Sequence, residues 1–93
     1  MTREELLKQA EQIVCNDRNG QYGQPEDNFG IIADYWGIFL GRGITAKEVA
    51  VMMALFKIAR MQTAIKNKSD SWIDAIGYLA CGGEIAWKEE GED

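Results

Sequence analysis

Asp70 and Asp74 stand four residues apart in a segment with helical apolar spacing, so both carboxylates would lie on one helix face. Glu48 opens an earlier helical segment. Carboxylate ligands of this kind suit Mg²⁺ or Mn²⁺, which in turn suit the phosphates of a substrate. These three acids are the candidate metal ligands, with Glu48 and Asp74 as candidate catalytic residues. Two simpler interpretations stay open: a capping role for Glu48 with Thr45, and first-turn acids favoured by the helix dipole.

Basic and aromatic residues form a second group of candidates. Lys57 and Arg60 stand three residues apart on the same helical segment as Glu48. Arg18, Tyr22 and Gly23 lie in the connection "DRNGQYGQPEDNF", where a guanidinium and an aromatic ring suit a nucleotide base and its phosphate. The five residues are therefore candidate nucleotide-binding residues. The simpler interpretation is a plain turn, with the two helix cations facing solvent.

Other chemistry is disfavoured by what the chain lacks. It contains no histidine, which removes the commonest general base and zinc ligand. It contains no P-loop, and Cys15 and Cys81 have no CxxC companion, so both are expected to be buried free thiols. The net charge of −5 argues against a nucleic-acid partner. With no signal segment and no run of about 20 apolar residues, we expect a cytoplasmic protein without membrane contact.

The apolar periodicity predicts an all-α fold. We expect one domain over residues 1–89, followed by a frayed acidic tail over 90–93. Capping boxes at Thr2–Glu5 and Thr45–Glu48, together with Pro25 at a first helical position, mark three of the helix starts. The expected helices cover residues 2–16, 25–40, 45–66 and 70–89.

The distribution of apolar residues predicts an oligomer. The helix over 25–40 has one apolar stripe through Phe29 and Ala33 and a second through Ile31, Tyr35 and Ile38. The helix over 45–66 is apolar on most sides and is expected to be the central element. Gly77, Gly82 and Gly83 in the last helix would let another backbone approach closely. A chain of 93 residues with 46% hydrophobic residues hides such surface most simply against further copies of itself.

Three stretches resemble a known family: "DRNGQYGQPEDNFGIIADYWGIFLG", "EVAVMMALFKIARMQ" and "DSWIDAIGYLACGGEIA". They resemble small phage and prophage proteins that are largely described as a domain of unknown function and grouped with the MazG-like all-α nucleotide pyrophosphohydrolases. The resemblance runs over about residues 17–86. Its most specific parts are the loop of Arg18 and Tyr22 and the helix of Asp70, Asp74 and Tyr78.

The resemblance implies a four-helix MazG-like bundle completed by oligomerisation, as a dimer or larger assembly. It also implies magnesium-dependent cleavage of a nucleoside triphosphate to a monophosphate and pyrophosphate, with carboxylates supplied by an ExxE pair and an ExxD pair. Asp74 matches the closing aspartate of the second pair, whereas Ser71 stands where that pair has an acid. Val51 follows Glu48 at the third position, so the first pair is incomplete as well.

Three functions follow from this pattern. The first is a Mg²⁺- or Mn²⁺-dependent nucleotide pyrophosphohydrolase, with Lys57, Arg60 or Arg18 offsetting the charge that develops on the phosphate. The second is an oligomeric sponge that needs no metal and sequesters a nucleotide or cyclic-nucleotide immune signal, which is an anti-defence role for a phage protein. The third is a purely structural protein.

Overall fold

The computed structural model describes residues 1–17, 20, 21 and 23–91 of the chain. Within these residues all regular secondary structure is helical, and no strand occurs. The elements are α1 (Arg3–Gln12), the π-helical segment η1 (Ile13–Asp17), α3 (Pro25–Leu40), α4 (Ala46–Thr63) and α5 (Ser69–Glu89). The prediction of an all-α chain is confirmed, while the MazG-like bundle stays a prediction.

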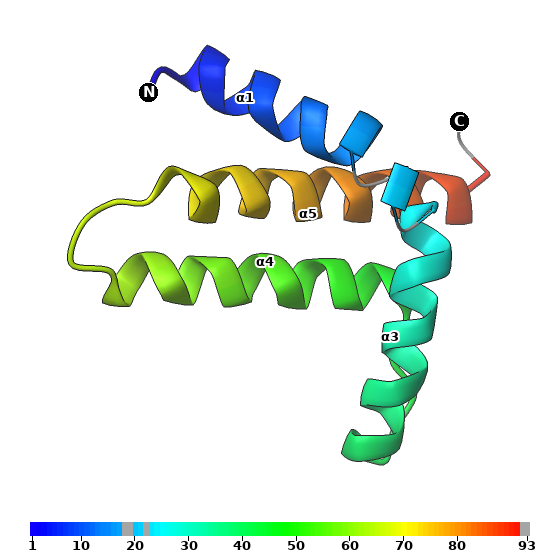
Figure 1. The fold of residues 1–93 in the computed structure, drawn as a ribbon. Helices are drawn as coiled ribbons and strands as arrows, with labels where there is room; N and C mark the ends of the chain where they lie inside the picture. The colour runs from blue at the N-terminus through cyan, green and yellow to red at the C-terminus, as the bar shows by residue number, and fades with distance from the viewer. Residues whose placement is uncertain (18–19, 22, 92–93) are drawn as a thin grey trace.

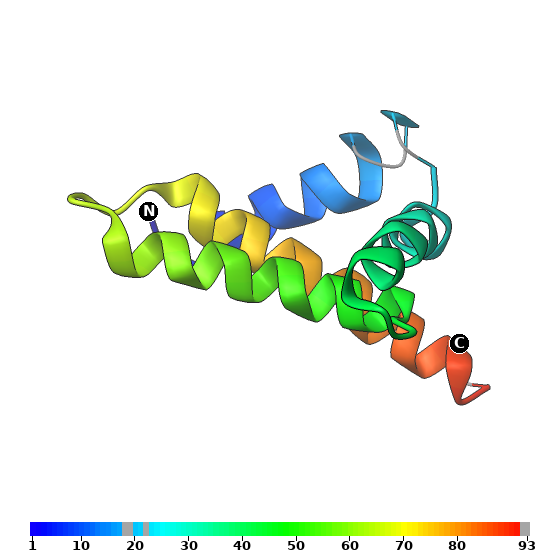
Figure 2. The same cartoon turned by 90° about the horizontal axis from the view of Figure 1, so that it is seen from below.

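The helix pair α4 and α5 forms the body of the molecule. The two helices run side by side in opposite directions, joined by the connection over residues 64–68 (Figures 1 and 2). α1 lies along α5 and does not contact α4. α3 crosses one end of the pair, so that its C-terminal half projects from the body as an arm (Figure 1). The molecule therefore has an open corner between this arm and α4.

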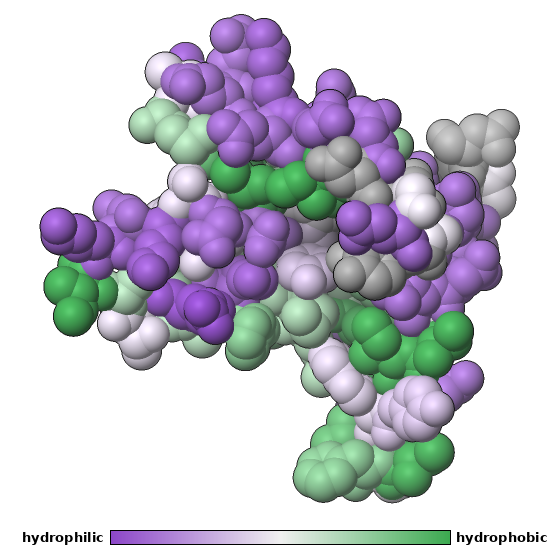
Figure 3. All heavy atoms as spheres, in the orientation of Figure 1, coloured by the Kyte–Doolittle hydropathy of each residue, from purple (hydrophilic) through white to green (hydrophobic). Residues whose placement is uncertain are grey.

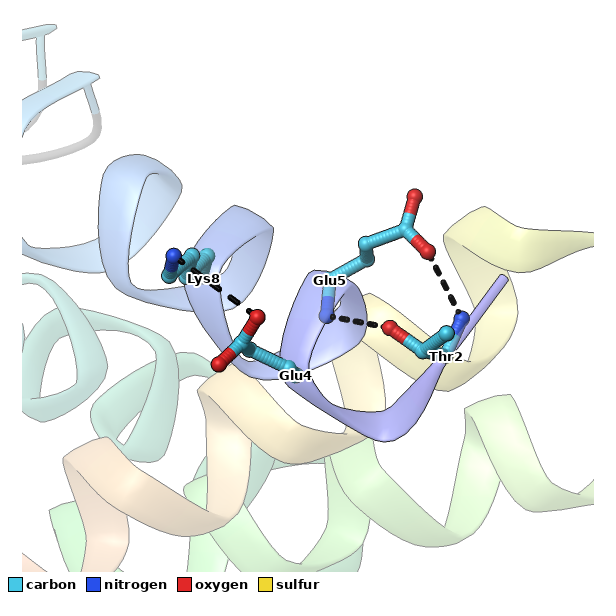
Figure 4. Close-up of polar contacts among 4 residues, drawn as sticks. All are labelled: Thr2, Glu4, Glu5 and Lys8. Atoms are coloured by element: carbon cyan, nitrogen blue, oxygen red, sulfur yellow. Dashed lines mark hydrogen bonds and ion pairs between the residues drawn. The ribbon is translucent and has the colours of Figure 1, made fainter.

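Local signals explain most helix ends. The Thr2 hydroxyl accepts a hydrogen bond from the Glu5 backbone N–H at 3.1 Å, and the Glu5 carboxylate accepts one from the Thr2 N–H at 3.0 Å (Figure 4). Lys8 pairs with Glu4 at 3.9 Å on the same helix. Thr45 makes the equivalent capping box at the start of α4. The predicted capping boxes are thus confirmed.

The buried core lies where α3, α4 and α5 meet. Phe29 and Val49 are its largest fully buried side chains. The buried core cluster consists of Phe29, Ala33, Val49, Ala50, Cys81 and Ile85. The α3 stripe through Phe29 and Ala33 therefore faces the core, as the periodicity indicates.

Two sequence expectations need correction, and a third holds with a change of geometry. The first helical segment ends at Asp17, close to the predicted residue 16, but its geometry changes from α-helical to π-helical after Gln12. α4 ends at Thr63 instead of about residue 66, where the Thr63 hydroxyl lies 3.5 Å from the Ala59 and Arg60 carbonyl oxygens and Ala64 turns extended. Cys15 is exposed, whereas Cys81 is buried as expected.

The central element is α5 rather than α4. Among the described elements, α5 contacts each of the others, whereas α4 contacts only α3 and α5. Small residues allow this: a Cβ on Gly77 would lie 2.8 Å from Val14 Cγ1, and one on Gly82 would lie 3.0 Å from Ala50 Cβ. A Cβ on Gly83 would meet nothing within 4 Å. Close approach is confirmed at Gly77 and Gly82 and is wrong at Gly83.

Candidate functional site

The candidate site is built around an ion pair between α4 and α5. Lys57 Nζ lies 2.9 Å from the Asp74 Oδ2, with the two side chains 16% and 30% exposed respectively. Both residues were candidates from the sequence, but their pairing was not foreseen. The antiparallel packing of α4 and α5 brings Lys57 and Asp74 together, and the spacing of residues in the sequence does not predict this contact.

A small pocket adjoins this pair. It has a volume of about 120 Å³ and lies between η1 and α5; its lining residues are Ile13, Val14, Ile73, Asp74, Gly77, Tyr78 and Cys81. Gly77 forms part of the pocket wall. A larger residue would not fit there, because its Cβ would collide with the Val14 side chain. The Tyr78 ring packs against Phe29 with 6.1 Å between ring centroids. Pockets that enclose whole small-molecule ligands measure about 300–1,000 Å³. This one has room for only part of a ligand.

Asp70 lies one helical turn before Asp74. It is exposed in the first turn of α5, and the spacing of four residues puts both carboxylates on one side of the helix. Ser71, which stands where the resemblance calls for an acid, is buried at 6% exposure. α5 therefore offers two carboxylates side by side.

Glu48 lies at the other end of the helix pair. Its carboxylate accepts a hydrogen bond from the Thr45 backbone N–H at 3.0 Å and lies 3.9 Å from Arg42. The hydrogen bond from Thr45 lowers the pKa of Glu48 below its ordinary value of 4.5. The neighbouring Lys47 pairs with Glu89, near the C-terminal end of α5. These contacts account for Glu48 as a capping residue.

The structure does not bring Glu48 together with the two aspartates. Glu48 precedes Lys57 by nine residues of α4, which corresponds to about 13 Å along the helix axis. Because Lys57 contacts Asp74, Glu48 lies about that far along the helix pair from Asp74. Within the described residues, no three acidic or cysteine side chains form a group that could hold a metal ion. A site with all three predicted ligands would require a contribution from outside the single chain.

The predicted basic residues lie in different surroundings. Lys57 and Arg60 both flank the Phe56 ring, at 5.9 and 5.7 Å from its centroid. Lys57 is partly buried against α5, whereas Arg60 is exposed. Arg60 is therefore the one of these two cations that faces solvent.

Only part of the predicted loop can be described. Arg18 and Tyr22 lie outside the described residues. Gly23 has a φ of +77°, a left-handed conformation that favours glycine, and directly precedes the Gln24 cap of α3. The turn into α3 is therefore a sufficient reason for a glycine at position 23. The first turn of α3 then contacts α5 where Glu26 pairs with Lys88 at 3.2 Å, a link between distant residues that the sequence patterns did not indicate.

Comparisons with known proteins identify relatives of the chain. The model of the family described as "Domain of unknown function (DUF6378)" matches residues 5–86. The Gene 55 protein of Mycobacterium phage D29 is 36% identical over 78 residues, covering 84% of this chain and 51% of that protein. The Gene 55 protein of Mycobacterium phage L5 is 39% identical over 75 residues, covering 78% of this chain and 47% of that protein.

The chain thus spans about half the length of these phage proteins. No solved structure matches it. Among the described residues, no helix combines the length and the apolar character that a membrane crossing needs.

Proposed function

This chain belongs to the DUF6378 family, and we propose that it recognises nucleoside triphosphates at Asp74 and Lys57 and hydrolyses them with Mg²⁺. The observation that supports this most is the partly buried pair itself, in which the Lys57 ammonium and the Asp74 carboxylate lie 2.9 Å apart and Asp74 also lines a pocket. A carboxylate at such a position suits a cation, and an ammonium group suits a phosphate oxygen. The resemblance to MazG-like enzymes points in the same direction. The family's relatives in phages suggest a phage-encoded protein that acts in the host cytoplasm.

The residues of α5 fit a magnesium ion in part. Mg²⁺ is commonly held by one or two carboxylates together with substrate phosphates, and Asp70 and Asp74 could supply two carboxylates. Mg²⁺, when bound, would polarise the phosphoryl group and offset its negative charge. Lys57 would exchange its contact with Asp74 for one with a phosphate oxygen, and Arg60 would attract the anionic substrate from the solvent side.

A second function has its own supporting observation. The described residues contain no group of three acidic or cysteine ligands, and Glu48 is occupied as a cap at the far end of α4. An incomplete set of acids favours binding without cleavage. The alternative is therefore a sponge that sequesters a nucleotide or cyclic-nucleotide signal, which would serve a phage against host defence.

One experiment separates these functions. The protein is mixed with Mg²⁺ and a panel of nucleotides and cyclic nucleotides, with binding measured by calorimetry and turnover by release of pyrophosphate. Hydrolysis predicts turnover that Asp74→Asn reduces at least about 10-fold, because mutating even an outer-shell partner of a bound metal costs about 10–100-fold in affinity or activity. Glu11→Gln is the control, because Glu11 is an exposed carboxylate on α1, away from the Lys57–Asp74 pair and from α3. Binding without turnover would support the sponge, and neither binding nor turnover would contradict both functions.

The loop can be tested within the same assay. If Arg18 contacts the ligand, Arg18→Ala should weaken nucleotide binding by about 1–3 kcal/mol, the range for losing a charge-assisted hydrogen bond. If Arg18 serves only the ligand, the melting temperature of the free protein should hardly change. Unchanged binding with a clearly lower melting temperature would instead make Arg18 a structural residue.

A further inference from the structure

The arm formed by the C-terminal half of α3 has an apolar face that no other part of the described chain covers. Ile31 and Tyr35 are 57% and 69% exposed, and Ile38 and Phe39 are 80% and 91% exposed. We call these four residues the α3 arm face. They lie on the side of α3 away from Phe29 and Ala33, which are buried in the core. α3 is thus apolar on both sides but packed on one.

The arm face continues into the corner between α3 and α4. A pocket of about 390 Å³ lies there, lined by Trp36, Phe39, Leu40 and Met52. Leu55 and Phe56 extend the exposed apolar surface along α4. In Figure 3, hydrophobic residues gather along the projecting arm, while hydrophilic residues dominate the surface over α1. The corner offers an apolar recess that could receive a large side chain from another molecule.

The exposed area of the chain matches what a dimer would bury. The accessible surface is 6655 Å² for a chain of 10.4 kDa. A compact monomer of this mass exposes about 5,400 Å². The excess, about 1,250 Å², is larger than the roughly 800 Å² that each partner buries in a standard interface. The radius of gyration of 13.9 Å likewise exceeds the approximately 12.3 Å of a compact domain of this length.

The charge distribution allows a second copy to dock at the arm. The chain carries a net charge of −5, so two copies repel each other over most of their surfaces. Residues 28–41 carry a single charge, at Asp34, and no cation. Two arms can therefore meet without bringing many acids together, while an acidic partner would find no cation on the arm to bind.

We infer that the α3 arm face is the interface of a homodimer. A two-fold axis brings the same four residues of both copies together, and Phe39 also lines the recess between α3 and α4 in each copy. None of the four arm residues belongs to the Lys57–Asp74 pair or lines the pocket beside it.

Light scattering coupled to gel filtration tests this dimer. The wild-type chain at micromolar concentration should show twice the chain mass of 10.4 kDa. Phe39→Asp and Ile38→Lys should each raise the dimer dissociation constant at least about 100-fold, as expected for central interface residues, and so yield monomers. Their helicity by circular dichroism should match the wild type, because both side chains are at least 80% exposed.

Leu7→Asp is the matched control. Leu7 is also a large apolar side chain, 58% exposed, but it lies on α1, which does not contact α3 or α4. This variant should remain a dimer. A monomeric wild type would overturn the inference and leave the arm face to a different protein. An assembly that persists in either folded arm variant would overturn it as well, because another surface would then hold the copies together.

Discussion

Gly82 of α5 faces Ala50 of α4 with no room for a methyl group between them. A Cβ on Gly82 would lie 3.0 Å from Ala50 Cβ, and both residues are buried. In a Gly82→Ala variant, neither the new Cβ nor the Ala50 Cβ could rotate away, because each is fixed to a helix backbone. This contact sets the close spacing of the antiparallel pair that also carries Lys57 and Asp74.

Gly82→Ala should therefore destabilise the protein. Overpacking a core typically costs about 1–3 kcal/mol, which exceeds the roughly 0.5–1 kcal/mol that alanine contributes over glycine within a helix. Urea unfolding followed by circular dichroism measures the change.

Gly83→Ala provides the matched comparison. A Cβ at this exposed position would meet nothing within 4 Å, so only the helix propensity changes. The free energy of unfolding should rise by about 0.5–1 kcal/mol. Stabilisation by both substitutions would show that α4 and α5 do not approach as closely as described.

The role of Glu48 can be separated from a metal role by a conservative change. Glutamine at the same position can still accept the hydrogen bond from the Thr45 N–H, so Glu48→Gln should leave the melting temperature close to that of the wild type. Thr45→Ala removes the hydroxyl that accepts from the Glu48 N–H at 3.1 Å and should cost about 1 kcal/mol. Thermal unfolding of both variants checks this. A Mg²⁺-dependent rise in melting temperature that disappears in Glu48→Gln would contradict a role limited to capping.

The helix starts could be predicted from the sequence because their signals are local. A threonine and a glutamate three residues later define the starts of α1 and α4, and Pro25 begins α3. The end of α4 could not be predicted in the same way. No glycine or proline stands at residues 63–66, and the chain leaves the helix where the Thr63 hydroxyl approaches backbone carbonyls.

The candidate site could be predicted only as a set of residue types. Asp74 and Lys57 stood out by chemistry, but their contact depends on how α4 and α5 align, which no local pattern encodes. The same alignment separates Glu48 from Asp74, although the resemblance groups them. Cys15 has apolar neighbours in the sequence and is nevertheless exposed. Tertiary packing decides all of these features.

Glu26 and Lys88 should make stability depend on pH. The pKa of Glu26 is lowered from 4.5, first by a hydrogen bond from its own backbone N–H and then by Lys88, while Glu26 raises the pKa of Lys88 above 10.5. A lowered carboxyl pKa means that the folded state binds this proton less readily than the unfolded state. The stabilisation by Glu26 is therefore present above pH 4.5 and is lost as the pH falls through the folded-state value. The contribution of Lys88 is present below pH 10.5 and is lost at more alkaline pH.

Melting temperatures of wild type and Glu26→Gln, measured from neutral pH to below 4.5, check this dependence. The difference between the two proteins should shrink as the pH falls, because the wild type loses the charge that the variant already lacks. Glu11→Gln serves as the control, since Glu11 is exposed on α1 and makes no ion pair within the described part of the chain. A constant difference across the pH range would contradict the assignment.

The Lys57–Asp74 pair should contribute more to stability than the exposed pairs do. Its atoms lie 2.9 Å apart and its side chains are 16% and 30% exposed, whereas Lys8 and Glu4 lie 3.9 Å apart and are 75% and 78% exposed. A double-mutant cycle with Lys57→Met and Asp74→Asn should give a coupling free energy of about 1 kcal/mol, the upper end of the range for exposed pairs. The cycle for Lys8 and Glu4 should give no more than about 0.5 kcal/mol.

Salt and ligand make this cycle informative about the site. The Lys57–Asp74 coupling should fall less with added salt than the Lys8–Glu4 coupling, because partly buried charges are screened less. If Asp74 binds a cation together with a nucleotide, saturating Mg²⁺ and nucleotide should stabilise the wild type but not Asp74→Asn, and the coupling measured under those conditions should change. The same coupling with and without ligand would mean that the pair only joins α4 to α5. In that case the ligand site would have to be sought away from Asp74.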